Sequence, residues 1–306
     1  MMNGNLFLSP APHIKSSNST QKIMLNVIVA TIPAIVASAI IFGIRALFVI
    51  FVTVLSCIIS EYLSRKITKR NRTINDLSAV VTGILLAFSL PVNIKFSIAF
   101  LGGIIAIVVT KQLFGGIGQN FVNPAICSRI ILMVSFPLAM SSWPNPYNRT
   151  IFPCDMTTTA TPLARADVVE ISYLDLFLGN CPGCLGEVCA MALLLGGIYL
   201  ISKNIISPVI PLCFIGTVFV LTALFGQDPL FHVLSGGLFL GAIFMATDYV
   251  TSPITLKGKI IFAIGCGIIT VFIRLYGVLP EGVSFSILLM NILVPHIENL
   301  TLRKKG

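Results

Sequence analysis

Apolar segments of membrane-spanning length follow one another along almost the whole chain. A transmembrane helix needs about 20 mostly apolar residues, and somewhat fewer when it is short. Ten segments meet this requirement, namely 23–43, 46–63, 77–91, 95–113, 122–140, 185–201, 204–225, 230–247, 258–276 and 283–300. Charged residues make up only 10% of the 306 residues, against about 25% in soluble domains. The sequence therefore predicts an all-α polytopic membrane protein with ten transmembrane helices, and it excludes a soluble enzyme or a disordered chain.

The distribution of Lys and Arg predicts how these helices are oriented, because basic residues are retained on the cytoplasmic side of a membrane. The densest basic runs are 65–72 and 303–305, which fall on one side if the ten segments alternate in direction. We therefore expect a multi-pass protein of the cell (inner) membrane with both termini in the cytoplasm. The net charge of +9 then reports topology, and no nucleic-acid partner is expected. An alternative role of the 65–72 run is to bind anionic lipid or a partner.

A polar stretch, residues 141–184, interrupts the apolar pattern and contains Trp143, the single tryptophan of the chain. In the ten-helix arrangement it follows the fifth helix and lies outside the cytoplasm. The predicted organisation is thus a first membrane repeat at 1–140 (helices 1–5), an extracytoplasmic loop at 141–184 and a second membrane repeat at 185–306 (helices 6–10).

The two halves are weakly similar in sequence. SLP at 89–91 matches TSP at 251–253, and GIIAIVVTKQLFG at 103–115 is similar to GIITVFIRLYG at 267–277. Five is an odd number of helices, so the second half must insert upside down relative to the first. The sequence therefore predicts two inverted five-helix repeats, an arrangement that places functional sites near the repeat interface in transporters.

The polar loop holds an unusual threonine-rich run, Asp155-Met-Thr-Thr-Thr-Ala-Thr-Pro-Leu163. One interpretation is a loop that caps the next helix, because Thr and Asp side chains bond to free backbone N–H groups. The other is a hydroxyl that carries a phosphoryl group near a helix start, where anions are stabilised.

This run resembles the D-x-x-[ST]-G-A-T motif in which FMN is attached to Thr through a phosphoester bond. The motif belongs to the family that contains the D subunit of the Rnf electron-transport complex and the B subunit of the Na+-translocating NADH:quinone oxidoreductase. The resemblance extends from about residue 21 to 297 and includes TGILLAFSLP (82–91), KQLFGGIGQNFVNPA (111–125), GEVCAMALLLGGIYL (186–200), HVLSGGLFLGAIFMATDYVTSP (232–253) and RLYGVLPEGVSFSILLMNILVP (274–295). The reductase B subunit has a longer N-terminal extension than this chain, which is more similar to the Rnf D subunit.

The resemblance implies that Thr161 carries a covalent FMN, with Asp155 six residues before it as the motif requires. The Gly of the motif is Thr159 here, so Thr158 and Thr159 are alternative attachment sites. Arg165 is close enough in sequence to offset the phosphate charge, and its alternative role is that of an exposed loop charge.

The resemblance further implies a subunit that is inactive alone and has no catalytic residues of its own. The complex would move electrons between reduced ferredoxin and NAD+ and couple them to Na+ or H+ transfer. Its partners would be the other membrane subunits and an FMN-bearing subunit outside the membrane. The alternatives are a B subunit of the Na+-translocating reductase and a solute or ion channel of inverted-repeat fold with no redox role.

Several charged residues lie in or at the ends of the apolar segments. An acid inside a membrane is costly and is usually functional. Asp248, near Thr247, Thr251 and Ser252, supplies oxygen ligands of the kind that suit a hard cation, and its alternative role is that of a helix cap. Glu187 is expected mainly to cap the sixth helix. Arg129 and Arg274 are expected to pair with an acid or to reach outward to the membrane surface.

Two further motifs have simple interpretations. The glycines of GGIGQN (115–120) lie between two apolar segments without a βαβ context, which argues against a dinucleotide site and favours a helix break or a re-entrant turn. In the family that the chain resembles, such regions lie near a second, non-covalent flavin, riboflavin, in the reductase B subunit, so the resemblance makes riboflavin a possible second cofactor. Cys181 and Cys184 form a C-x-x-C pair, interpreted as incidental rather than as a redox dithiol.

Overall fold

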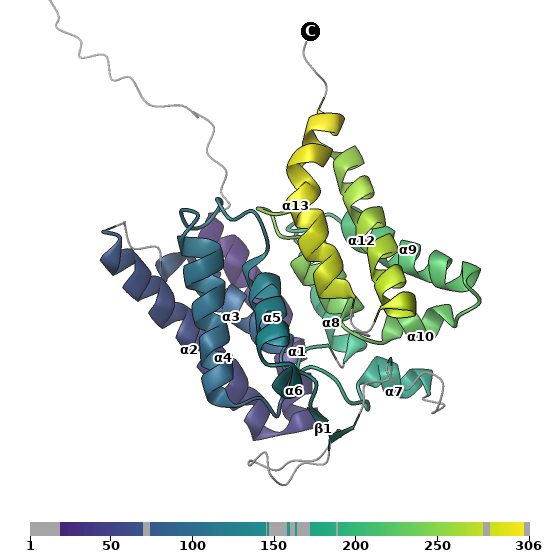
Figure 1. Cartoon of the computed structure of the whole chain (residues 1–306), viewed down its shortest axis with the longest axis horizontal. Coiled ribbons are helices and arrows are strands. Elements are labelled where there is room, and N and C mark those ends of the chain that lie inside the picture. Colours follow the sequence, from purple (N-terminus) through teal and green to yellow (C-terminus); the bar gives the residue numbers. More distant parts are fainter. Residues whose placement is uncertain are drawn as a thin grey trace, which may run out of the picture.

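The computed structural model of the chain describes residues 19–69, 74–144, 146, 158–159, 163, 172–187, 189–277 and 282–302. Within these residues the chain is overwhelmingly helical (Figure 1). Four helices of the described part are long and apolar enough to cross a membrane, namely α1 (Thr20–Phe42), α2 (Ile44–Ile67), α12 (Leu256–Tyr276) and α13 (Val283–Thr301). The structure thus has the architecture of an all-α membrane protein.

Shorter elements occupy the remaining apolar segments. Those of the first half are η1 (Ile74–Asp76), α3 (Ser78–Phe88), α4 (Phe96–Ile104), the π-helix η2 (Ile105–Gln112), α5 (Pro124–Ser135) and α6 (Pro137–Met140). The polar stretch contributes β1 (Trp143–Pro144), β2 (Thr158–Thr159) and α7 (Tyr173–Leu178). The second half adds α8 (Ala190–Ser202), α9 (Val209–Leu224), α10 (Pro229–Leu234), α11 (Leu238–Leu240) and the π-helix η5 (Gly241–Met245).

The segment 230–247, expected to be a single helix, is broken between α10 and α11. Ser235 adopts an extended conformation with φ −96° and ψ 148°, and Gly236 follows with φ +62°. A positive φ is readily adopted by Gly and interrupts helical hydrogen bonding. The expectation of one continuous helix at this place was therefore wrong.

The segment 122–140 is also shorter as a helix than expected. The Asn123 side chain caps α5 by accepting hydrogen bonds from the N–H groups of Ala125 and Ile126. The helix ends at Ser135, because Pro137 has no N–H and restricts Phe136, which leaves the helical region with φ −131° and ψ 59°. The short helix α6 then begins at Pro137.

The helices form two groups that meet along α1 and α8 (Figure 1). In the first group α2 packs against α3 and α4, and in the second α12 packs against α9 and α13. Glycines permit the closest approaches: a Cβ on Gly83 of α3 would lie 2.7 Å from the Val54 Cα of α2. Small residues at such contacts are characteristic of helix packing in membranes.

Large apolar side chains also cover much of the outer surface. Phe51, Leu212 and Ile254 are among those exposed, at 62%, 69% and 81% of their accessible area. Soluble monomers rarely expose apolar surface on this scale, whereas a membrane protein presents it to lipid.

Candidate functional site at the junction of the two halves

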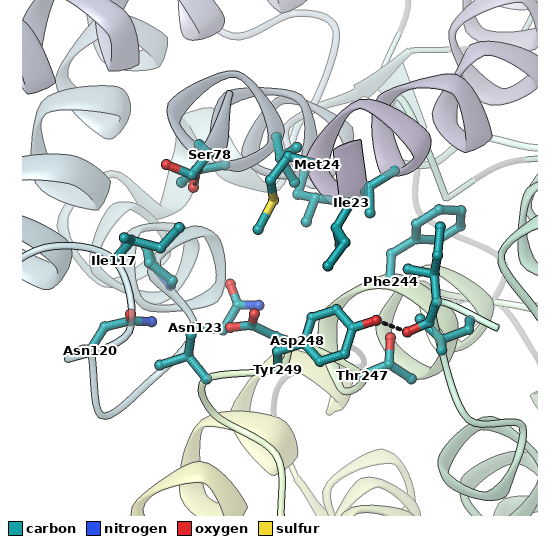
Figure 2. A pocket seen from close by; sticks show the side chains of 18 of the residues that line it. Ile23, Met24, Ser78, Ile117, Asn120, Asn123, Phe244, Thr247, Asp248 and Tyr249 are labelled. Atoms are coloured by element: carbon teal, nitrogen blue, oxygen red, sulfur yellow. Dashed lines mark hydrogen bonds between the residues drawn. The ribbon is translucent and has the colours of Figure 1, made fainter. Parts of the chain in front are cut away.

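A pocket of about 810 Å³, including its open part, lies where the two groups of helices meet. Figure 2 shows Ser78, Asn120, Asn123 and Asp248 around its central space, with Met24 and Phe244 on the apolar walls. The polar lining comes from α3, η2, the loop before α5 and the segment after η5, with side chains of Ser78, Thr82, Lys111, Asn120, Asn123, Thr247, Asp248 and Tyr249. An apolar cavity with a few convergent polar groups is typical of a small-molecule or cofactor site.

Asparagine side chains join the halves beside the pocket. The Asn123 Nδ2 donates a hydrogen bond of 3.2 Å to the Met245 carbonyl at the end of η5. The amide of Asn291, on α13, accepts from the Asn123 N–H at 3.1 Å and donates to the Thr251 carbonyl at 3.0 Å. The ends of α5 and η5 are thereby fixed relative to each other, and so are the pocket walls that they carry.

The glycine-rich loop after η2 forms another part of the pocket wall. Gly115, Gly116 and Gly118 adopt φ values of +123°, +106° and +87°, which L side chains rarely adopt. This backbone brings Ile117 and Asn120 to the pocket. The loop connects two helices, as expected, and has no strand in front of it that would make it a nucleotide-binding turn.

A buried charge cluster stands behind the pocket. The Lys111 Nζ lies 3.0 Å from Glu61 Oε2 and 3.2 Å from Glu61 Oε1, and it donates a 2.6 Å hydrogen bond to Ser78 Oγ. Gln112 Nε2 donates to Glu61 Oε1 at 3.2 Å, and Arg65 Nε lies 3.7 Å from the same oxygen. The sequence interpretation missed this cluster, although Glu61 and Lys111 fall inside predicted membrane segments and such residues are candidates for function.

Asp248 lies at the pocket, in the turn that follows η5. Its Oδ2 accepts a 3.2 Å hydrogen bond from Thr251 Oγ1, and its carbonyl accepts one of 3.1 Å from the Ser252 N–H. The Thr247 hydroxyl instead donates to the Ile243 carbonyl at 2.5 Å. The structure therefore brings Asp248 together with Thr251. In the described part of the chain, no group of three or more His, Cys, Asp or Glu side chains could hold a metal ion.

The residues predicted for flavin attachment lie largely outside the described part of the chain. Thr161, Asp155 and Arg165 are in this group. Thr158 is described through its backbone, in β2, where it pairs with Pro144 of β1 in antiparallel fashion. Leu163 lies near Gly236, since its Cδ1 is 2.6 Å from the position that a Cβ of Gly236 would occupy.

Arg129 and Glu187 form an ion pair between the two halves. Arg129 Nη1 donates to Glu187 Oε1 at 2.6 Å and to Ser284 Oγ at 3.0 Å. Both side chains of the pair are only 4% exposed. Of the two roles expected for Arg129, the structure shows the pairing with an acid. The expectation that Glu187 caps the sixth helix was wrong, because α8 begins at Ala190 with Cys189 as its N-cap. Arg274, in contrast, donates to the carbonyls of His232 and Ser235.

The cysteines of the C-x-x-C pair are free and buried. Cys184 Sγ donates to the Ser89 carbonyl at 3.3 Å and accepts from Arg129 Nη2 at 3.4 Å. Burial is the main cause that raises the pKa of the Cys181 thiol to about 12. Such a thiol is a poor nucleophile, which agrees with the interpretation of the pair as incidental.

The fold and the pocket define a helical membrane protein with a largely apolar pocket, lined by a few polar groups, between two groups of helices. The sequence matches the profile of the NQR2, RnfD, RnfE family over residues 7–305, and the chain belongs to that family.

The names of several relatives state their roles. The chain is 50% identical, over 97% of its length and 94% of the relative, to the D subunit of the Na(+)-translocating ferredoxin:NAD(+) oxidoreductase complex of Acetobacterium woodii. It is 43% identical, over 97% of its length and 95% of the relative, to the D subunit of the proton-translocating ferredoxin:NAD(+) oxidoreductase complex of Clostridium ljungdahlii. It is 38% identical, over 92% of its length and 91% of the relative, to the D subunit of the ion-translocating oxidoreductase complex of Stutzerimonas stutzeri.

Proposed function

We propose that this chain is the D subunit of an ion-translocating ferredoxin:NAD+ oxidoreductase complex, in which it relays electrons coupled to Na+ or H+ transport. The observation that carries the proposal is the match over nearly the full chain to relatives with that name. The subunit acts only within the complex, and its partners are the other membrane subunits and an FMN-bearing subunit outside the membrane. The names of the relatives favour this assignment over a subunit of the quinone-reducing complex.

The first cofactor in this proposal is FMN joined to Thr161 through a phosphoester bond. Its support is the DMTTTATP run at 155–162, with Asp155, Thr158 and Arg165 as neighbours that position the loop or offset the phosphate charge. A covalent tether keeps a flavin in a loop that could not retain a freely dissociating one. The flavin supplies the redox chemistry, and the protein supplies its position and electrostatic surroundings.

The second cofactor is a non-covalent flavin, riboflavin, in the pocket between the halves. The lining suits such a group, because Met24, Leu85 and Phe244 provide apolar surface and the side-chain amide of Asn120 offers a polar contact. When bound, the flavin would accept and release electrons, and these side chains would orient its ring and limit the access of water.

The coupling ion is assigned to Asp248. Its carboxylate, the Thr251 hydroxyl and nearby carbonyls are hard oxygen ligands that suit Na+, and the carboxylate also serves as a proton acceptor. An Asp248→Asn variant should assemble normally and lose ion transport in inverted vesicles while electron transfer by uncoupled complexes persists. Unchanged ion transport would reduce Asp248 to a residue that stabilises the turn.

The arrangement in the membrane completes the proposal: ten spans form two inverted repeats, 1–140 and 185–306, with the termini in the cytoplasm and the flavin loop, 141–184, outside the cell membrane. In Figure 1, α13 ends at the upper side of the molecule, whereas β1 and α7 lie at the lower side. This placement supports a C-terminus and a loop on opposite faces.

The test of flavin attachment is the Thr161→Ala variant, compared with Thr157→Ala as its control in the same run, because Thr157 occupies a position that the motif leaves open. The complex is denatured, separated on a gel and viewed under ultraviolet light. The wild-type and Thr157→Ala bands should fluoresce, and the Thr161→Ala band should be dark at an unchanged protein level. A fluorescent Thr161→Ala band would place the bond on another residue.

A further inference from the structure

The ion pair between Lys111 and Glu61 borders the pocket and has no part in the function proposed above. Both residues are buried, with 3% and 0% of their areas exposed. Lys111 lines the pocket from η2, and Glu61 lies behind it on α2, bound to the ammonium through both carboxylate oxygens. The cationic partner of the pair is therefore the one that faces the cavity.

The groups around Lys111 hold its ammonium in one place. Ser78 Oγ accepts from Nζ at 2.6 Å and in turn donates to Asp76 Oδ1 at 2.5 Å. Arg65 approaches Glu61 from the next turn of α2, so it shares the carboxylate with Lys111. An ammonium bound to both Glu61 oxygens and to Ser78 in a buried site cannot turn away from the pocket without losing these bonds.

The charges at this wall of the pocket nearly balance. Glu61 and Asp76 are the acids next to Lys111 and Arg65, and Asp248 is near enough across the pocket for its charge to interact with that of Lys111. A fixed charge at a buried site acts strongly on a neighbouring group, because little water screens it. Lys111 and Asp248 are the charged residues among those that line the described part of the pocket, so a change in charge within it acts directly on Lys111.

We propose that Lys111 sets the charge preference of this pocket: its ammonium stabilises the reduced, more electron-rich form of a bound isoalloxazine relative to the oxidised form, and Glu61 is the positioning residue that holds it there. The inference rests on the flavin assigned to the pocket under the proposed function. Charges placed near a flavin ring are a general means by which a protein adjusts its electronic properties.

Two substitutions should shift this preference in opposite directions. Lys111→Met removes the cation and should weaken binding of reduced relative to oxidised flavin at least tenfold, which is about 30 mV for a two-electron couple. Glu61→Gln removes the anion behind it and should shift the same ratio toward the reduced form. Lys111→Arg keeps the charge and should stay near the wild-type ratio. If Lys111 and Glu61 had a purely structural role, both substitutions would lower the affinity for the oxidised and the reduced flavin alike. The ratio of the two affinities would then not shift in opposite directions in the two variants.

The experiment is equilibrium dialysis of the full-length chain in lipid nanodiscs against riboflavin, once oxidised and once reduced with dithionite without oxygen. The expected result is wild-type binding of both forms and the opposite shifts just described. Wild-type binding with an unchanged ratio in Lys111→Met and in Glu61→Gln would overturn this inference and leave the flavin pocket standing. Absence of riboflavin binding by the wild-type chain would overturn both. If gel filtration shows that Lys111→Met does not fold, the inference is tested on the other two variants. Glu61→Gln should then shift the binding ratio toward reduced flavin while Lys111→Arg keeps the wild-type ratio, and an unchanged ratio in Glu61→Gln would overturn the inference.

Discussion

Removing Arg129 should strongly destabilise the contact between the two halves. Arg129→Ala leaves Glu187 buried without the Nη1 that lies 2.6 Å from its Oε1, and it also deletes the donor to Ser284. Loss of one partner of a buried ion pair costs about 3–5 kcal/mol of the free energy of unfolding. With both side chains only 4% exposed, the upper part of that range applies.

The assay is unfolding of the purified chain in mixed micelles with increasing SDS, followed by circular dichroism and by the fluorescence of Trp143. The double variant Arg129→Leu/Glu187→Leu should recover much of the lost stability, because it leaves no uncompensated charge. Lys257→Ala, on the exposed start of α12, serves as control and should change stability by less than about 0.5 kcal/mol. Equal effects of Arg129→Ala and Lys257→Ala, or additive losses in the double variant, would show that the pair does not hold the halves together.

Three further outcomes are expected. Gly83→Ala should destabilise the packing of α2 on α3 by about 1–3 kcal/mol, because the new Cβ would meet Val54, whereas Gly216→Ala, which points into open space, should be neutral or stabilising in the same SDS titration. Cys181 should resist iodoacetamide at pH 8 in the folded protein, because burial raises its pKa to about 12; rapid labelling detected by mass spectrometry would contradict this. For Asp228, burial acts to raise the pKa, but hydrogen bonds from the Tyr173 hydroxyl and from two backbone N–H groups outweigh it and lower the pKa. The stability that its carboxylate contributes is therefore fully present above the ordinary pKa of about 4 and is lost as the pH falls through the lowered value. Hydrogen exchange at the start of α10 should accordingly be faster in Asp228→Ala than in wild type at pH 7, and the difference should shrink as acid protonates the carboxylate; a difference that stays constant throughout an acid titration would argue against this.

Much of the fold follows from the sequence, since long apolar runs leave few alternatives in a membrane. The break between α10 and α11 does not, because Ser235 and Gly236 lower the mean hydropathy too little to be seen in a window of membrane length. The end of α5 at Ser135 could have been predicted from Pro137. The residues after Pro137 remain apolar, however, so the apolar segment continues past the end of the helix.

The candidate site was predictable only in part. Asp248 stands out because it is an acid in an apolar run, and the structure places it at the pocket. The pairing of Glu61 with Lys111 depends on how α2 packs against η2. The two residues lie 50 positions apart in the chain, so no local sequence pattern predicts their contact. The same is true of the bond between Asn123 and Met245, which joins the halves.

The proposed function depends above all on covalent attachment of an electron carrier to the native chain. Mass spectrometry of the intact subunit, taken from assembled complex without any flavin added, measures this attachment without an intermediate step. We expect a mass that exceeds that of the polypeptide by a single FMN joined with loss of water, with the modified peptide containing Thr161. A subunit with the mass of the unmodified polypeptide would contradict the proposed attachment.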